Sequence, residues 1–221
     1  VEIRPCDPQL KNTVHLLGFR ESDLRLPWRE GKVHILKMME GQIVTEDVRE
    51  EVGYTEEKGR KVFKPDGTYQ KIAAVERHKN TGKIGVGIVK GFGLRGGAIA
   101  SSVSHDSHNL IVIGDNDHDM YLAVQELLRT QGGYTLVENG QVFDTLPLPI
   151  MGLMSDAGYE KVNEKLARMI SKAHEMGIPE GFDPFITLSF MALPVIPEIR
   201  ITPRGVYLTQ EDRMIQSPFD R

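Results

Sequence analysis

The sequence predicts an α+β fold: a mostly antiparallel, buried sheet with two main amphipathic helices, preceded by a β-rich segment. Three observations predict it. Short β-branched apolar runs at 84–89 and 110–113 have the length and composition of buried strands. Apolar residues recur at helical spacing after Asp115 and again after Asp156. Asn139-Gly140, between alternating residues, is typical of a two-residue hairpin turn.

The first 70 residues are charged and strand-like. Strands are expected at 32–37, 42–48 and 61–64, the last of them ending before a Pro-Asp-Gly turn. We expect these strands to be antiparallel and exposed, with their Glu and Arg side chains in solvent. Two segments are therefore predicted, a β-rich one over 1–70 and an α+β one over 71–221. The chain begins at Val1 on an extended, proline-spaced stretch, which suggests a piece of a longer protein.

The second segment contains the predicted helices. Asp115 or Asn116 is the expected N-cap of the first helix, and Gly132-Gly133 ends it. The second helix follows Asp156, ends at Gly177, and is expected to bury one whole apolar face. That face comprises Tyr159, Val162, Leu166, Met169, Ile170 and Ala173. Four prolines in 182–204 favour packed loops and one strand there, with any helix short and ending before Pro194.

Composition excludes several classes of protein. The 221 residues, 40% of them hydrophobic and 26% charged, suffice for a core and do not fit a disordered, collagen-like or coiled-coil chain. A formal net charge of −4 lacks the basic footprint of a nucleic-acid or anionic-membrane surface. No apolar run approaches the roughly 20 residues of a membrane span. Cys6 is the single cysteine, which excludes an internal disulfide and favours a reducing compartment, so we expect a cytoplasmic protein.

A glycine pattern is the first candidate motif. Gly91, Gly93 and Gly96 form a G-x-G-x-x-G directly after the apolar run, and Asp115 lies about 20 positions later, where dinucleotide-binding folds hold a ribose. The following residues, 98–109, are poor helix formers and resemble a strand leading into a polar loop. A turn or bulge between buried strands is therefore favoured, and a non-catalytic nucleotide-binding module is the alternative.

Six consecutive polar residues, 104–109, lie between two apolar runs and form the second candidate. Such a block is costly to bury unless its groups are hydrogen-bonded or contact a ligand. In a turn, His105 and His108 could address one ligand or metal, with Asp106 or Asn109 orienting an imidazole. A satisfied structural turn is the simpler interpretation. A complete metal site would need ligands from elsewhere.

Glu76 and His78 form a weaker candidate. Two residues apart on a strand they face the same way and could act as a base and its orienting partner, although an ion pair before a turn is simpler. No G-x-S-x-G, P-loop lysine motif or H-E-x-x-H is present. Nucleophilic catalysis by Cys6, close to the chain end, is not expected.

Many collinear blocks resemble one family. They include Val-Glu-Arg-His at 75–78, Thr-Gly-Lys-Ile-Gly at 81–85, Val-Lys-Gly-Phe-Gly-Leu at 89–94, Gly-Ala-Ile-Ala-Ser-Ser-Val at 97–103 and His-Asp-Ser-His-Asn at 105–109. Further blocks lie at 11–15, 41–45, 146–150, 152–156, 184–190 and 193–198. Together they resemble the C-terminal domain of bacterial adenine deaminase over essentially the whole chain.

The resemblance implies an amidohydrolase of purine salvage that converts adenine to hypoxanthine and ammonia with a divalent metal pair, manganese or iron. In that family the metal ligands lie in an upstream (β/α)8 barrel that begins with a His-x-His strand, and this chain contains no His-x-His. We therefore expect no metal site in this segment and no activity from it alone. Residues 1–70 are expected to finish a β-sandwich beside the barrel.

The same resemblance places the polar block near the barrel mouth. His105, Asp106, His108 and Asn109 would help to shape, close or hydrogen-bond the purine site, with Glu76 and His78 as weaker contributors. The expected partners are adenine, the barrel of the same protein and further copies in a homo-oligomer, with no nucleic acid and no membrane. A purely structural oligomerisation domain is a third hypothesis, and it predicts an exposed apolar face.

Overall fold

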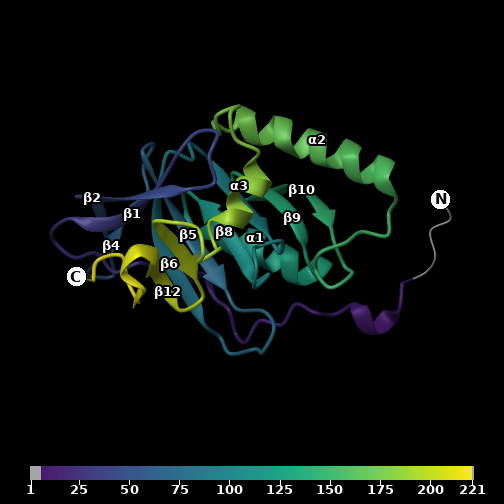
Figure 1. Ribbon diagram of the computed structural model, residues 1–221, viewed down its shortest axis with the longest axis horizontal. Coiled ribbons are helices and arrows are strands. Elements are labelled where there is room, and N and C mark those ends of the chain that lie inside the picture. The colour runs from purple at the N-terminus through teal and green to yellow at the C-terminus, as the bar shows by residue number, and fades with distance from the viewer. Residues whose placement is uncertain (1–5, 221) are drawn as a thin grey trace.

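An eight-stranded sheet forms the centre of the computed structural model, which describes residues 6–220 (Figure 1). The strand order is β10-β9-β7-β8-β5-β6-β1-β2, and every neighbouring pair is antiparallel except β1 and β6. Its strands are β1 (Val33–Met38), β2 (Thr45–Glu50), β5 (Tyr69–Val75), β6 (Ile84–Lys90), β7 (Gly97–Ser101), β8 (Leu110–Gly114), β9 (Gly133–Glu138) and β10 (Gln141–Pro147).

Smaller elements surround this sheet. A two-stranded sheet joins β3 (Tyr54–Glu57) to β4 (Arg60–Phe63), and a three-stranded sheet joins β11 (Ile199–Thr202), β12 (Gly205–Leu208) and β13 (Arg213–Ile215). The α-helices of the described residues are α1 (Asp117–Thr130), α2 (Tyr159–Glu175) and α3 (Pro184–Phe190), with short 3₁₀ helices over Pro8–Leu10, Glu21–Leu24 and Thr209–Glu211. None of these helices is both long enough and apolar enough to cross a membrane.

Both faces of the large sheet are covered, and its central strands are mostly apolar, although β5 also buries Gln70 and Lys71. On β5, Ile72 and Ala74 join one hydrophobic layer while Ala73 and Val75 join the other, as strand periodicity requires. The first layer includes residues of α2, α3 and β11. The second layer includes α1. The predicted α+β class, with a buried and mostly antiparallel sheet, is confirmed.

Local signals placed both helices and the hairpin correctly. The Asn116 side chain caps α1 by accepting from the Asp119 amide at 2.8 Å, and Gln131, at φ 60°, ends the helix before Gly132. Asn139 and Gly140 both have positive φ, 48° and 78°, in the turn between β9 and β10. The four prolines favour packed loops over 182–204, but helix α3 forms there, because Pro184 stands at its first turn, where a proline is tolerated, and Asp183 caps it. The helix is short and ends before Pro194, and β11 is the one expected strand.

Two predictions about burial are wrong. The apolar face of α2 is only partly covered: Met169 and Ala173 are buried, but Tyr159 is exposed, because only the second half of α2 packs closely on the core. Strand β1 is buried rather than exposed, because it pairs with β6 through Leu36 and Val89 and becomes an inner strand. The division into 1–70 and 71–221 stays a prediction. The expected extended conformation at 1–5 lies outside the described residues.

Candidate functional site

The glycine motif forms a turn between two strands. Gly96 is followed directly by strand β7, and no helix starts there. The Asp115 carboxylate accepts hydrogen bonds from the Gly96 amide at 2.5 Å and the Gly97 amide at 3.1 Å. Asp115 therefore fastens the turn instead of holding a ribose. The dinucleotide-binding interpretation is wrong, and the alternative of a nucleotide-binding module loses its structural basis.

The polar block forms the loop between β7 and β8, which we call the 104–109 loop. It is turn-like: the His108 amide donates to the Ser104 carbonyl at 2.6 Å, and His108 has φ 49°. This geometry brings the His105 and His108 rings together, with centroids 5.7 Å apart. Burial, followed by the neighbouring His105 and Arg77, lowers the pKa of His108, which favours its neutral form.

Helix α3 supports the outer half of the loop. The His105 amide donates to the Ser189 carbonyl at 3.1 Å, and the His105 ring stacks on Phe190 with centroids 5.0 Å apart. Asp106, next in sequence, has 85% of its side chain exposed, and its carboxylate lies 3.9 Å from His105 Nδ1. The loop therefore presents an imidazole and a carboxylate to solvent beside an aromatic ring.

Arg77 supports the inner half of the 104–109 loop. Its buried guanidinium donates from Nε to the His108 carbonyl at 2.5 Å, and its other nitrogens reach the carbonyls of Thr13 and Met151 at 3.0 Å each. Its backbone amide donates to Asn109 Oδ1 at 3.3 Å. Burial lowers the pKa of Arg77 to about 10. Arg77 thus ties three separate segments of chain to the 104–109 loop.

The side chains of Glu76 and His78 do not form the expected pair of a base and its orienting partner. The Glu76 carboxylate accepts from the amides of His78, Lys79 and Thr81 at 2.6, 2.7 and 2.9 Å. Partial burial raises the pKa of Glu76, but these hydrogen bonds outweigh it and bring the pKa to about 2. His78 Nε2 donates instead to the Ser107 carbonyl at 2.7 Å. No hydrogen bond between the two side chains occurs in residues 6–220, so both hold backbone in place.

A pocket of about 470 Å³ opens beside the loop. Its polar side is formed by Ser104, Asp106, Ser107 and Asn109, and its apolar side by Ala74, Ala192, Leu193, Pro194, Val195, Ile201 and Pro203, with Thr202 between them. A small set of polar groups facing an apolar wall is the usual lining of a small-molecule site.

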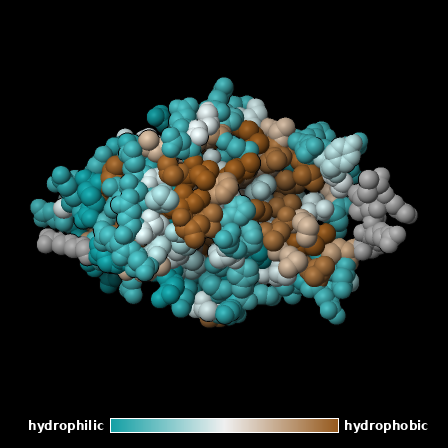
Figure 2. Space-filling view, viewed as in Figure 1, coloured by the Kyte–Doolittle hydropathy of each residue, from teal (hydrophilic) through white to brown (hydrophobic). Residues whose placement is uncertain are grey.

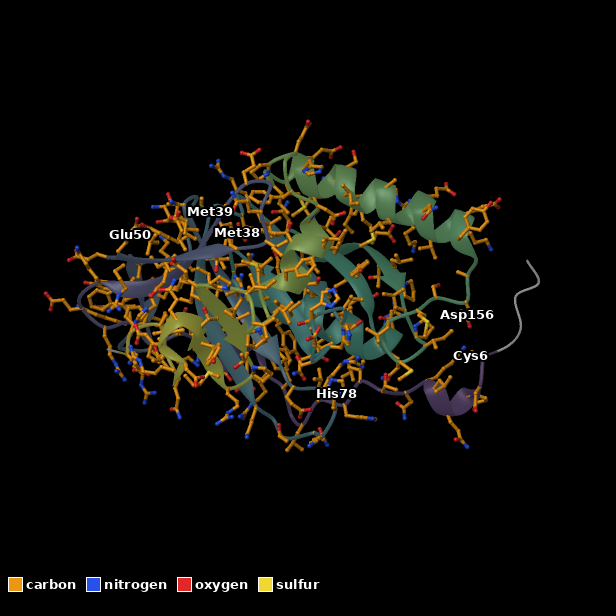
Figure 3. All side chains as sticks on the ribbon, viewed as in Figure 1. Cys6, Met38, Met39, Glu50, His78 and Asp156 are labelled. Carbon is orange, nitrogen blue, oxygen red and sulfur yellow. The ribbon has the colours of Figure 1, made fainter. Side chains whose placement is uncertain are left out.

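A metal pair does not fit these residues. No group of three or more His, Cys, Asp or Glu side chains in the described range 6–220 could hold a metal ion. His105, Asp106 and His108 supply two rings and one outward carboxylate, too few for a closed site. Cys6 is also remote: Figure 3 shows it at the Asp156 end of the molecule, well separated from His78.

Comparison with known proteins gives the family. A model of the adenine deaminase C-terminal domain matches residues 42–213. The chain belongs to the adenine deaminase C-terminal domain family. The resemblance found in the sequence blocks is thereby confirmed, and the 104–109 loop, Arg77 and all the residues that line the pocket lie inside the matched region of this family.

Individual relatives agree with this family match. The chain is 50% identical over 216 residues to an adenine deaminase of Desulfitobacterium hafniense, covering 98% of this chain and 37% of that protein. It is 45% identical to an adenine deaminase of Nitratidesulfovibrio vulgaris and 42% identical to adenine deaminase 2 of Carboxydothermus hydrogenoformans, covering 91% and 90% of this chain and 35% of each relative. The chain spans little more than a third of the length of these relatives.

Sequence reasoning missed two groups around the pocket. Arg77 carried a usable signal, since strand periodicity places it on the same side as buried Val75. The apolar wall carried none, because residues 192–195 and 201–203 approach the loop only through the tertiary packing of α3 and β11.

Proposed function

We propose that this chain is the C-terminal part of an adenine deaminase, an enzyme that hydrolyses adenine to hypoxanthine and ammonia. The observation that carries the proposal is the 50% identity to an adenine deaminase across 98% of this chain. The metal pair of manganese or iron, which would activate water, belongs to the part of the deaminase outside this chain. A cytoplasmic location, a role in purine salvage and homo-oligomer formation belong to the same proposal.

The 104–109 loop and its pocket would contribute to the purine site. Adenine is flat and apolar on both faces, while its edge carries an amino group and ring nitrogens. The Asp106 carboxylate can accept from an N–H of the base, and the Ser104 hydroxyl, which also lines the pocket, can donate to a ring nitrogen. Pro203 and Val195 supply apolar surface for the ring faces. These groups would bind and orient the base.

His108 would act as a neutral hydrogen-bond donor. Its Nδ1 accepts from the Ser104 amide at 3.3 Å, so the ring hydrogen of the neutral form resides on Nε2. The lowered pKa of His108 keeps this form dominant near neutral pH. His105, stacked on Phe190, would close one side of the site.

Alanine variants of the complete deaminase test the role of the loop. We expect His105→Ala and His108→Ala each to lower turnover by more than about tenfold, which corresponds to about 1.4 kcal/mol in the barrier. His118→Ala is the matched control. This exposed histidine lies on α1, on the other side of the sheet, and pairs with Glu21. Unchanged turnover in both loop variants would remove the loop from the active site.

A further inference from the structure

An exposed apolar surface borders the pocket. We call it the α3 face and define it by Ile43, Ile186, Phe190, Pro194 and Val195. Ile43 is 53% exposed, Ile186 55% and Val195 81%. Figure 2 shows apolar surface gathered over α3 and the elements beside it. Contiguous apolar surface of this kind marks an interaction site more often than scattered single residues do.

The α3 face is continuous with the candidate site. Ile43, Ile186 and Phe190 line one small cavity between the β1–β2 turn and α3. Phe190 in turn stacks on the His105 ring. Pro194 and Val195 line the pocket that also contains Asp106. A protein surface that contacts the 104–109 loop from outside would therefore contact the α3 face as well.

The sequence of α3 supports burial on both sides. Its seven residues, Pro-Phe-Ile-Thr-Leu-Ser-Phe, are apolar around most of the helix. Phe185 and Leu188 are buried in the core, whereas Ile186 points outward. The apolar surface of a helix is normally buried, whereas the outer side of α3, which carries Ile186, lacks a cover among residues 6–220.

The exposed valine is held in a fixed turn. The Leu193 amide donates to the Phe190 carbonyl at 3.1 Å, and the Ile196 amide donates to the Leu193 carbonyl at 3.1 Å. These bonds present Val195 outward at the tip of the connection between α3 and β11. A preformed apolar turn favours docking because its backbone would lose little conformational entropy on binding.

We propose that the α3 face is the surface against which the remaining part of the deaminase packs. This inference rests on the proposed function. The relative from Desulfitobacterium hafniense is covered by this chain over only 37% of its length, so the larger part of that protein is available as the occupant. That part must approach the 104–109 loop if the loop contributes to the purine site, and the α3 face surrounds the approach.

Hydrogen exchange tests the contact without relying on catalysis. In the complete deaminase, amides of residues 185–197 should exchange at least about tenfold more slowly than in the 221-residue chain, whereas strand β8 should be equally protected in both. Equal exchange at 185–197 with equal protection of β8 would overturn the proposal, even if the complete protein deaminates adenine. Protection in the 221-residue chain that rises with its concentration would identify a second copy as the occupant and overturn it too.

Variants within the complete deaminase make the test independent of how well the shorter chain folds. The double variant Ile186→Asp, Val195→Asp should lose the slow exchange at 185–197. Val142→Asp is the matched control, since Val142 is 41% exposed on the edge strand β10 and lines neither cavity. Retained protection in the double variant would contradict the contact. A protected face in a complete protein that does not deaminate adenine would support the contact and reject the proposed activity.

Discussion

Two buried arginines hold the loops around the candidate site. Arg77 binds the carbonyls of His108, Thr13 and Met151, and Arg200 binds those of Ile43, Pro197 and Ile199. Burial lowers the pKa of each to about 10. A guanidinium suits this task because its planar fork can satisfy several carbonyls at once. The shape of the pocket rim therefore depends on two side chains that do not line the pocket.

Replacing Arg77 tests this anchoring role. Arg77→Met should lower the free energy of unfolding by about 3 kcal/mol, because the buried guanidinium is lost and three backbone carbonyls lose their donor. Urea unfolding of the 221-residue chain measures the change. Arg129→Met is the control: its side chain is exposed and paired with Glu126, so its loss should lower the free energy of unfolding far less than the loss of Arg77. Equal effects of the two variants would show that Arg77 is not an anchor.

Glu76 predicts a pH dependence of stability. Its pKa in the folded chain is lowered to about 2 from an ordinary value of 4.5. The stabilisation is therefore fully present above pH 4.5 and is lost as the pH falls toward 2. Glu76→Gln should cost about 1 kcal/mol at pH 7, and the difference from the unaltered chain should shrink over that acidic range. A difference that stays constant from pH 7 to pH 2 would contradict this account.

Among the elements, the C-terminal sheet packs closely on β6. A Cβ placed on Gly85 of β6 would lie 2.0 Å from the Thr202 carbonyl oxygen, a distance at which backbone must move. Thr202 ends β11 and lines the candidate pocket together with Pro203. The absence of a side chain at Gly85 therefore sets how near the apolar wall comes to the 104–109 loop.

Gly85→Ala should lower the free energy of unfolding by about 3 kcal/mol, since the obstructing atom belongs to backbone and cannot rotate away. Thermal or urea unfolding of the 221-residue chain would measure it. Gly53→Ala is the matched control, because nothing lies within 4 Å of its added Cβ and its φ is outside the left-handed region. Similar stability of the two variants would show that β11 has room to shift.

Local signals predicted the elements, and tertiary contacts decided their surroundings. The Asn116 cap, the Asn139-Gly140 turn and the glycine stop after α1 act within a few residues, so the sequence revealed them directly. The pairing of β1 with β6 joins residues more than 50 positions apart, and no local pattern encodes it. Helical spacing identified α2 but could not tell how much of its apolar face would be covered.

The candidate site follows the same division. The cost of burying polar groups pointed to the 104–109 loop, whose turn-like form brings His105 and His108 together. The glycine pattern was ambiguous because a turn between strands and a phosphate-binding turn both favour glycine, and the structure confirms the favoured turn between strands. Asp115 separates the two interpretations only through its hydrogen bonds to the Gly96 and Gly97 amides. Spacing alone carries no information about those bonds.

At the scale of the whole molecule, the pocket and the α3 face adjoin one another in a chain whose described residues lack a set of metal ligands. Under the proposed function, this face would form one wall of an active site whose metal is held by another part of the protein. The proposal is supported by the family match and by the coverage of little more than a third of each relative.

A comparison of adenine deamination by two proteins tests most directly whether the metal is held outside this chain. Ammonia release from adenine would be measured for the 221-residue chain and for the complete deaminase, each supplied with manganese or iron. We expect the complete protein to release ammonia and the 221-residue chain to release none, because no metal-ligand set exists in residues 6–220. Ammonia release by the 221-residue chain alone would contradict the account.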